Sequence, residues 1–583
     1  MGYNCSFDAR GSEVEPYGDI AGPGVIAGFL GTAWLAVIFV LLHYLFVFDP
    51  YEDPFQGGNG NNSGDADRQW RANPIDSLVK SIVKKGLERM NVGSSWAYGL
   101  EMSILGMCDV QFVTGLGILI SGFIDLPKGI SAYHFILVTH LAWFSNLTHI
   151  CGLTVLRQYF HTRPTEKLIR IICMIILAIM LLVAIGPTLF FNWAHSDEGT
   201  ASLAGTSAIC FYNPSRSADW HERTTDQWAD LGGSTAFQSG IMSVILLVLS
   251  LLSRTIKFHY AFSNYFKRIR NYYDRKRVHQ TETLANRGTE TSGIRAIVVR
   301  RALLYSQVAS SLTVRLYSDL VISTLSDLYW LVVSAAWGTA KLFMTKFSAT
   351  VDENDWTFGQ VLPAFLLIGP IATAVKGALD RQINSPQSTI NESTTPAEQN
   401  ASDDHAAIFH DAEHLNEPIE MRRFRQHLSN CLGRNYYDTS TCSWIIPVFC
   451  FLCIQILEVT VLMFLELVVQ RSSATNALFA VFFLIVIISP TATYLLILSC
   501  LFFEHSGTDD RGYLVAFSAF ISMVLLGLYS MYPVWGVLYP YSPSGTETSA
   551  SRIGQDPVIL GVSAPLFLMA VLGYTAPLWI FGK

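Results

Sequence analysis

The sequence predicts an all-α polytopic integral membrane protein with about eleven transmembrane helices. Of its 583 residues, 51% are hydrophobic and only 15% are charged, and the mean hydropathy is +0.34. A soluble domain has about 25% charged residues, so most of this chain is expected to lie in lipid. The aromatic share of 13% is typical of a protein with Trp and Tyr at both membrane interfaces.

Apolar runs long enough to cross a bilayer recur along the whole chain. A helix of about 20 residues, rising ~1.5 Å per residue, covers the hydrocarbon thickness. The sixth run is the least regular, because it contains Asp319 and Asp327. We expect eleven spans, to within one, at 24–47, 102–124, 131–156, 168–191, 235–256, 316–342, 357–375, 443–469, 475–503, 512–538 and 557–581.

The distribution of Lys and Arg predicts the orientation, because these residues accumulate in cytoplasmic loops. The segments on the N-terminal side of the predicted membrane contain seven Lys and Arg residues, and the segments on the other side contain 29. This asymmetry places the N-terminus outside and the C-terminus in the cytoplasm. Residues 1–23 are mostly acidic and lack the basic start of a secretory signal, so we expect span 24–47 to remain as an anchor, with the plasma membrane as the location.

The expected spans divide the chain into two membrane units. An outer tail, 1–23, precedes a seven-helix unit, 24–376, which includes an outer loop, 192–234, and a basic inner loop, 257–312. A cytoplasmic linker, 377–442, is rich in Ser, Thr, Asn and Glu, and its composition predicts disorder. A four-helix unit, 443–583, follows.

Two features on the outer side are specific enough to test. Asn4-Cys5-Ser6 is an acceptor pattern for N-glycosylation, so Asn4 is expected to carry a glycan. Cys5 and Cys210 are the cysteines in the expected outer segments, where disulfides persist. We expect them to pair, and two free thiols are the alternative.

Two basic segments on the inner side predict contact with lipid headgroups. Residues 75–89 have apolar residues at helical spacing and Lys and Arg on the other faces, as in helices that lie on an anionic leaflet. Residues 260–277 alternate aromatic residues with cations. In a soluble protein such a run would indicate nucleic-acid binding, but directly after a membrane helix it favours anionic headgroups of the inner leaflet. We expect the bilayer as a partner and no nucleic acid.

Polar side chains at membrane depth are the candidates for function, because they are costly there unless they face a protein interior or a wet cavity. The second span, 102–124, contains Asp109 and Gln111. The third span, 131–156, contains His134, His140, Asn146 and His149. We predict a polar interface between these two spans, with Asp109 and His149 as the best candidates.

Intramembrane acids form a second set of candidates. The sixth span contains Asp319 and Asp327, and the eighth contains Glu458 and Glu466; each pair is eight residues apart and lies within about 80° on its helix. Carboxylates and His at this depth are typical of a proton or cation relay. The alternative is that they lie at the interface or form hydrogen-bonded links between helices.

Several kinds of catalytic site are not expected. His410-Asp411-Ala412-Glu413-His414 has the spacing of inverted zinc peptidases, but a solvated helix start explains it, and we expect no metal. Haem would need axial His from neighbouring helices, and His43 is the His that the other spans offer. The sequence has no phosphate loop and no G-x-S-x-G turn, which argues against an ATP-driven pump or a hydrolase. We therefore expect no cofactor.

Residues 109–157 resemble a group of polytopic membrane proteins from filamentous fungi that has no assigned activity. Some members look like neighbours of secondary-metabolite genes. The resemblance implies a fungal source and covers about a tenth of the chain; it carries no functional residues. The motifs that carry it are Asp109-Val-Gln111, Thr114-Gly115, Ser121-Gly122-Phe123, Gly129-Ile-Ser-Ala-Tyr133-His134, Leu141-Ala-Trp-Phe144, Thr148-His149 and Leu153-Thr-Val-Leu-Arg157.

The first seven expected spans also have the membrane topology of a G-protein-coupled receptor, with an outer N-terminus and a long basic third inner loop. The specific motifs differ. The inner end of the third span reads Leu156-Arg157-Gln158-Tyr159 instead of acidic-Arg-aromatic, the seventh span lacks Asn-Pro-x-x-Tyr, and four spans follow.

These observations predict a membrane transporter or exporter of a small solute, ion or metabolite. Protons are a plausible coupling ion, and a link to a secondary-metabolite pathway is expected. A receptor-like sensor that uses loops 192–234 and 257–312 is the first alternative. An intramembrane haem enzyme, based on the His content of the third span, is the second.

Overall fold

A computed structural model describes the helical framework of the chain. The residues that it describes contain helices and one isolated β-bridge, between Ser131 and Ser207. The all-α class is therefore confirmed for this part of the chain. The described residues are 14–52, 72–87, 94–189, 204–212, 235–257, 294–348, 353, 356, 358–383, 436–437, 442, 444–468 and 489–506.

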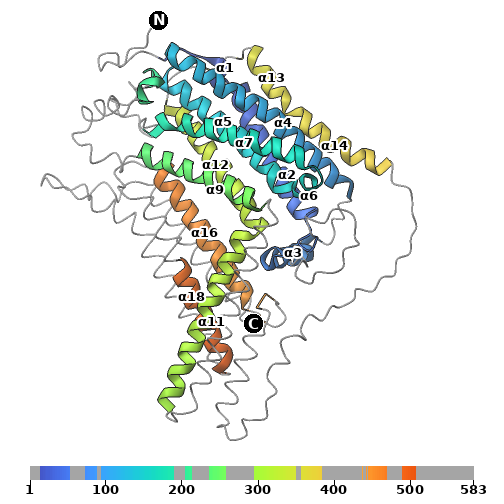
Figure 1. The fold of residues 1–583 in the computed structure, drawn as a ribbon, viewed down its shortest axis with the longest axis vertical. Helices are drawn as coiled ribbons and strands as arrows, with labels where there is room; N and C mark the ends of the chain where they lie inside the picture. The colour runs from blue at the N-terminus through green and yellow to red at the C-terminus, as the bar shows by residue number, and fades with distance from the viewer. Residues whose placement is uncertain are drawn as a thin grey trace, which may run out of the picture.

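A bundle of long helices forms the upper part of the molecule in Figure 1. Helix α5 lies inside it and contacts α2, α4, α7, α9 and α12, while α13 packs on α2 and α14 packs on α4. The bundle consists of α2 (Pro23–Phe46), α4 (Ser94–Asp125), α5 (Ala132–Val155), α7 (Pro164–Ile185), α9 (Thr235–Lys257), α12 (Thr324–Ser348), α13 (Phe358–Leu366) and α14 (Ile368–Ile383).

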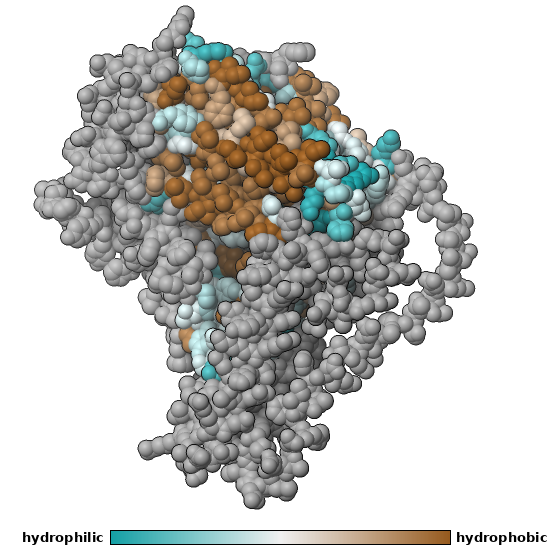
Figure 2. Space-filling view, viewed as in Figure 1, coloured by the Kyte–Doolittle hydropathy of each residue, from teal (hydrophilic) through white to brown (hydrophobic). Residues whose placement is uncertain are grey.

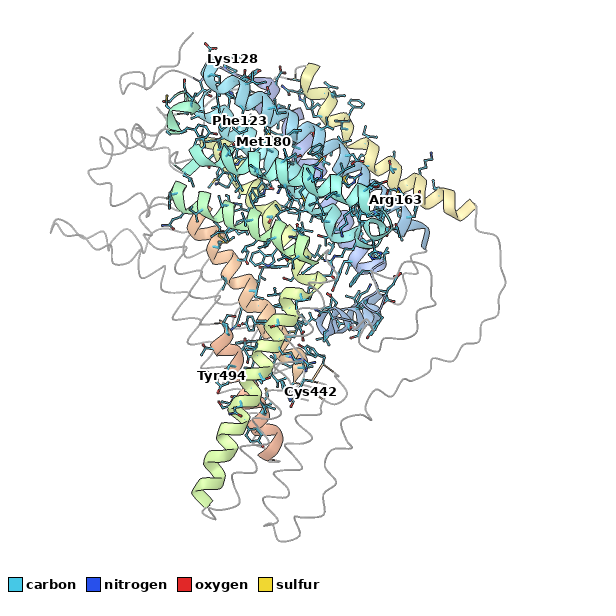
Figure 3. All side chains as sticks on the ribbon, viewed as in Figure 1. Phe123, Lys128, Arg163, Met180, Cys442 and Tyr494 are labelled. Atoms are coloured by element: carbon cyan, nitrogen blue, oxygen red, sulfur yellow. The ribbon has the colours of Figure 1, made fainter. Side chains whose placement is uncertain are left out.

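Short helical segments complete the bundle at its two ends. Lys128 and Arg163, labelled in Figure 3, mark these ends. We name them after the charged residues described below: the Glu353 end, which contains Lys128, and the Asp327 end, which contains Arg163. The short segments are α1 (Gly18–Ala21), α6 (Arg157–Thr162) and the 3-10 turns Leu126–Lys128, Gly186–Leu189 and Ala208–Tyr212.

A second group of helices extends below the bundle and has its own apolar core. Helix α11 packs on α18 and α3, and α16 reaches up to contact α9 and α12. These helices are α3 (Pro74–Leu87), α11 (Ile294–Ile322), α16 (Ile445–Val468) and α18 (Ser489–Ser506).

The expected sixth span, 316–342, is interrupted at Ser323, where α11 and α12 meet with a bend of 63°. At the end of α11, the Ser323 hydroxyl donates a hydrogen bond to the carbonyl of Leu320. The carboxylate of Asp76 accepts hydrogen bonds from the backbone N–H groups of Thr324 (2.9 Å) and Leu325 (3.1 Å), which caps the start of α12. The sequence offered no Gly or Pro at this position, so the break was not predicted.

Six helices of the described part are long and apolar enough to cross a membrane, and the bent pair 305–322 and 324–346 would make a seventh. The apolar outer face of the bundle is visible in Figure 2. The chain is thus a helical membrane-spanning protein. The expected spans 512–538 and 557–581, and the first half of 475–503, lie outside the described residues, so the count of eleven and the orientation stay predictions.

Local sequence signals explain why α5 begins where it does. Gly129 has a φ of 96°, a left-handed conformation that favours glycine and ends the preceding 3-10 turn. Ser131 is the N-cap, and its side chain accepts a hydrogen bond from the backbone N–H of His134. From Ala132 to Thr154 every residue is buried, which explains the mixed polar and apolar sequence of this helix.

Candidate functional site

The interface between α4 and α5 is built from small residues and is closely packed. A Cβ atom at Gly115 would overlap the side chain of Ser145, and one at Gly152 would overlap the thiol of Cys108. The Ser145 hydroxyl donates to the backbone carbonyl of Gln111. Such close approach of backbones is typical of small residues in membrane helices, and it leaves little room for a solute.

Asp109 lies outside this interface. Its side chain is 59% exposed and forms an ion pair with Arg170 of α7, with an Nη2–Oδ2 distance of 3.0 Å. The helical period explains the difference: Cys108 faces α5, and the next residue points about 100° away from that face. The predicted interface therefore brings Gln111 next to Ser145 but does not include the Asp109 carboxylate.

Three other candidates lie buried near α4 and α5. The ring of His149 packs edge-on against Phe112, with 5.7 Å between centroids. Gln111 Oε1, Asn146 Oδ1 and His149 Nε2 are buried and have no hydrogen-bond partner among the described residues.

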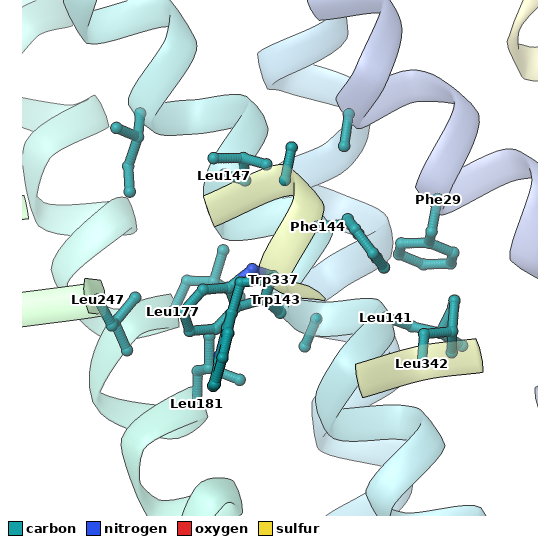
Figure 4. Close-up of a cluster of buried hydrophobic side chains, with 14 of the residues drawn as sticks. Phe29, Leu141, Trp143, Phe144, Leu147, Leu177, Leu181, Leu247, Trp337 and Leu342 are labelled. Carbon is teal, nitrogen blue, oxygen red and sulfur yellow. The ribbon is translucent and has the colours of Figure 1, made fainter. Parts of the chain in front are cut away.

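A polar cavity lies on the other side of α5, between α5, α7, α9 and α12. Its volume is about 10 Å³, the space of a single water molecule. Two basic side chains, His140 and Lys341, line it, and none of the lining residues is acidic. Figure 4 shows Trp143 and Trp337 close together beside leucines of α7 and α9. The other lining residues are Thr139, Trp143, Ile185, Thr188, Ser243, Trp337 and Gly338.

The hydroxyl of Ser243 connects the groups around this cavity. It accepts hydrogen bonds from Trp337 Nε1 at 2.9 Å and from Lys341 Nζ at 3.4 Å, and it donates to the carbonyl of Ser239. The ammonium of Lys341 also lies 5.9 Å from the centre of the Trp337 ring, within the range of a cation–π contact. Ser243 and Trp337 thus fix the position of the amine.

His140 shares the cavity with Lys341, and its ring is hydrogen-bonded to a residue of α12, the helix that carries Lys341. His140 Nε2 lies 3.2 Å from the hydroxyl of Thr345, which donates to the carbonyl of Lys341. The side chains of His140 and Lys341 line one small cavity, and repulsion between two cations there disfavours the state in which both are protonated. His140 lies ~12 Å along α5 from its start, so the pair lies well inside the membrane span.

A carboxylate cluster closes the Glu353 end of the bundle. Glu353 is fully buried and accepts hydrogen bonds from His134 Nε2 (2.8 Å), from the Tyr133 hydroxyl (2.9 Å) and from the backbone N–H of Tyr17 (3.1 Å). Burial by itself would raise the pKa of Glu353, but these hydrogen bonds hold the pKa below its usual value. His134 Nδ1 lies 2.8 Å from the Ser131 hydroxyl, so both ring nitrogens are engaged and His134 does not fit the role of a haem ligand.

A second charged cluster lies at the Asp327 end. Asp327 accepts from Arg157 Nη2 at 2.9 Å and from Lys257 Nζ at 2.8 Å. Arg254 is 2% exposed; its Nη2 donates to the Asp327 carbonyl at 2.7 Å, and its Nε donates to the Thr154 hydroxyl at 3.1 Å. Asp327 thus links the start of α12 to the end of α9 and to the start of α6, which follows α5.

The remaining predicted residues are separate from both clusters. Asp319 lies in α11, accepts a hydrogen bond from the Tyr437 hydroxyl at 2.7 Å, and does not line the cavity. Glu458 and Glu466 lie in α16, but their side chains are outside the described part, as are Asn4 and Cys5. Cys210 is disulfide-bonded, and its pairing with Cys5 stays a prediction.

Sequence reasoning missed four residues that the structure brings into these sites: Lys341, Ser243, Arg254 and Glu353. Lys341 was placed at the end of span 316–342, whereas α12 continues to Ser348 and carries Lys341 inside the membrane. Shifting the span to begin after Asp327 would have revealed an intramembrane lysine. Glu353 lies in a connection between helices, and its burial has no local sequence signal.

Comparisons with known proteins give one informative match. No protein-family model and no solved structure matches the chain. A stretch of 154 residues, 26% of this chain, is 28% identical to "Elsinochromes biosynthesis cluster protein HP3" of Elsinoe fawcettii. The match covers 51% of that protein, so the chain spans about half the length of the curated relative it matches. This similarity is compatible with the resemblance to fungal membrane proteins near secondary-metabolite genes.

Proposed function

We propose that this chain moves a small solute or ion across a membrane, with protons as the coupling ion, and that it serves a fungal secondary-metabolite pathway. One observation carries the proposal: His140 and Lys341 face one polar cavity inside a bundle of membrane helices. Ionisable residues at membrane depth are costly, and they usually mark ion or proton pathways.

The size of the cavity favours a proton over a larger ligand at this point. About 10 Å³ holds one water, which can pass a proton between two titratable side chains. Two basic side chains that line one cavity repel each other when both carry a proton, so the pair prefers states with fewer protons. Binding of an anion or opening of the bundle would change that preference, which is the property a coupling site needs.

Charged clusters lie at both ends of the bundle, on either side of this cavity. The Glu353 cluster lies at one end of α5, and the Asp327 cluster lies at the other. Apolar residues such as Leu147 and Leu331 lie between the cavity and the Asp327 cluster. Polar groups at both ends with an apolar barrier between them fit alternating access, in which one side opens at a time.

The link to metabolism rests on the relative, whose name assigns that protein to a biosynthesis cluster. Pathways that make a secondary metabolite need a membrane step when the product leaves the cell. We infer that this chain performs such a step, at the plasma membrane.

A metabolite comparison between a deletion strain and its parent tests the proposal. Cells and medium are extracted separately, with and without a protonophore. We expect unchanged totals, a shifted partition of one compound between cell and medium, and loss of the strain difference when the proton gradient is dissipated. A change in totals with an unchanged partition would instead indicate an enzyme or a regulator and would contradict transport.

A further inference from the structure

The cluster at the Asp327 end contains more positive than negative charge. Three cations, Arg157, Arg254 and Lys257, surround the single carboxylate of Asp327, and all but Arg157 are less than 15% exposed. The neighbouring acid is Asp76 of α3, which acts on Lys257. Among the residues that the structure describes, three cations face two carboxylates even with Asp76 ionised, and burying excess charge is costly without a counter-ion.

Asp76 lies next to the cluster, but its carboxyl group balances the positive charge of the cluster only in part. Burial raises the pKa of its carboxyl, although the backbone N–H groups of Thr324 and Leu325 and the Tyr44 hydroxyl, which donate to it, act in the opposite direction. Its two oxygens are already used by these three donors. The Asp76 carboxyl therefore caps α12 and is not available to pair with Arg157.

The three cations differ in how many of their donors are used. Arg254 donates to the Thr154 hydroxyl and to the carbonyls of Ser250 and Asp327, and Lys257 donates to Asp327 and to the Ser323 carbonyl. Arg157 differs, because its Nε is buried and has no hydrogen-bond partner among the described residues. The side chain of Arg157 is also 20% exposed, so an approaching ligand can reach it.

The position of the cluster indicates the kind of anion. It lies where α5 and α9 end and α12 begins, and the ends of membrane helices are where lipid phosphates are expected to meet a protein. Helix α3 packs beside it, and its Lys80 donates to the carbonyls of Tyr44 and Leu45 at the end of α2. Basic pockets between membrane helices at this level bind phosphate-bearing headgroups, and the planar fork of Arg suits a phosphate.

We propose that Arg157, supported by the charges of Arg254 and Lys257, binds the phosphate of an anionic lipid headgroup between the ends of α5, α9 and α12. The headgroup supplies negative charge and accepts from the exposed part of the Arg157 guanidinium. The site is independent of the transport proposal, since it concerns only what occupies this end of the bundle.

Thermal unfolding of the purified, delipidated full-length chain tests this site. The probes are short-chain phosphatidic acid, phosphatidylcholine of the same chain length, and inorganic phosphate. We expect phosphatidic acid to raise the unfolding midpoint saturably, and the other two to leave it unchanged at the same concentrations. Equal shifts with both lipids would overturn the site, and an equal shift with inorganic phosphate would overturn the assignment to a lipid.

Matched variants locate the binding. Arg157→Gln should raise the half-saturating concentration of phosphatidic acid about tenfold or more, because it removes a charge-assisted hydrogen bond. Arg163→Gln removes a cation at the same end of the bundle, but Arg163 is 53% exposed and pairs with Glu166, so we expect less than a twofold change. Equal weakening by both variants would show that only the overall charge matters and would overturn the site. If Arg157→Gln does not fold, the wild-type comparison of the three probes decides.

Discussion

The two sides of helix α5 pack in opposite ways. Toward α4, Gly115 and Gly152 let the backbones approach, and Ser145 and Cys108 fill the remaining space. Toward α9 and α12, large aromatic side chains and long cations meet and leave a water-sized polar cavity. Both sides contain polar residues, but on the second side a histidine and a lysine of different helices line the same cavity.

The difference teaches that polarity along one membrane helix is a poor guide to a pathway. Hydroxyl and thiol groups on the α4 side donate hydrogen bonds to nearby backbone carbonyls; the Ser145 hydroxyl, for example, donates to the carbonyl of Gln111. On the other side, Lys341 and His140 come from two helices and line one cavity, where Lys341 is hydrogen-bonded to Ser243 and His140 to Thr345. A site for protons requires the second arrangement, in which groups can exchange a proton.

The largest expected effect is on the closely packed side. In Gly115→Leu even the first side-chain atom would overlap Ser145, so we expect a loss of about 3 kcal/mol in the free energy of unfolding and little folded protein. Gly117→Leu is the matched control, because its Cβ would meet nothing within 4 Å. The measurement is the folded fraction after detergent extraction, and equal recovery of the two variants would refute the close packing.

A smaller, pH-dependent effect is expected at Glu353. A lowered pKa means that the folded state releases this proton more readily than the unfolded chain, so ionised Glu353 stabilises the fold at neutral pH. We expect Glu353→Gln to lower the free energy of unfolding by about 2 kcal/mol at pH 7. The difference from the wild type should decline as the pH falls below about 4.5, the ordinary pKa, and vanish below the folded-state pKa.

The control for Glu353→Gln is Glu166→Gln, which removes a carboxylate that is 43% exposed and paired with Arg163. Exposed pairs of this kind contribute about 0.5 kcal/mol. Thermal unfolding midpoints of the three proteins across pH 3–8 would measure both effects. A difference at Glu353 that grows as the pH falls would contradict the assigned hydrogen bonds.

The smallest effect is expected at Asp109. Its exposed carboxylate pairs with Arg170 on the outside of the α4–α5 interface, and an amide in its place still accepts a hydrogen bond. We therefore expect Asp109→Asn to keep transport within twofold of the wild type and to change stability by less than about 1 kcal/mol. Abolished transport in a folded Asp109→Asn protein would support the α4–α5 interface as the pathway instead.

Composition and apolar run length were sufficient to predict the helical membrane class and the positions of most described helices. The start of α5 was also readable, since Gly129 and Ser131 are typical of a turn followed by an N-cap. The break at Ser323 was not, because its cap comes from Asp76, more than 200 residues earlier in the chain. Long-range caps leave no periodic signal in the sequence.

The candidate site was predicted only in part. His140 was identified from its depth, but periodicity does not reveal which neighbour a face of α5 contacts, so Asp109 was a leading candidate and Lys341 was not among the candidates. Boundaries of membrane helices are uncertain by a few residues. For Lys341 this uncertainty decided whether the residue lay at an interface or in a buried cavity.

Complementation of the deletion strain with two variants tests the central claim most directly. Lys341→Met removes the buried amine but keeps a flexible chain of similar length, and Asp109→Asn removes the acid on the other side of α5. With equal amounts of folded protein, we expect Asp109→Asn to restore the parental partition of metabolites between cell and medium, and Lys341→Met to leave the partition of the deletion strain. Restoration by Lys341→Met together with failure of Asp109→Asn would contradict the account.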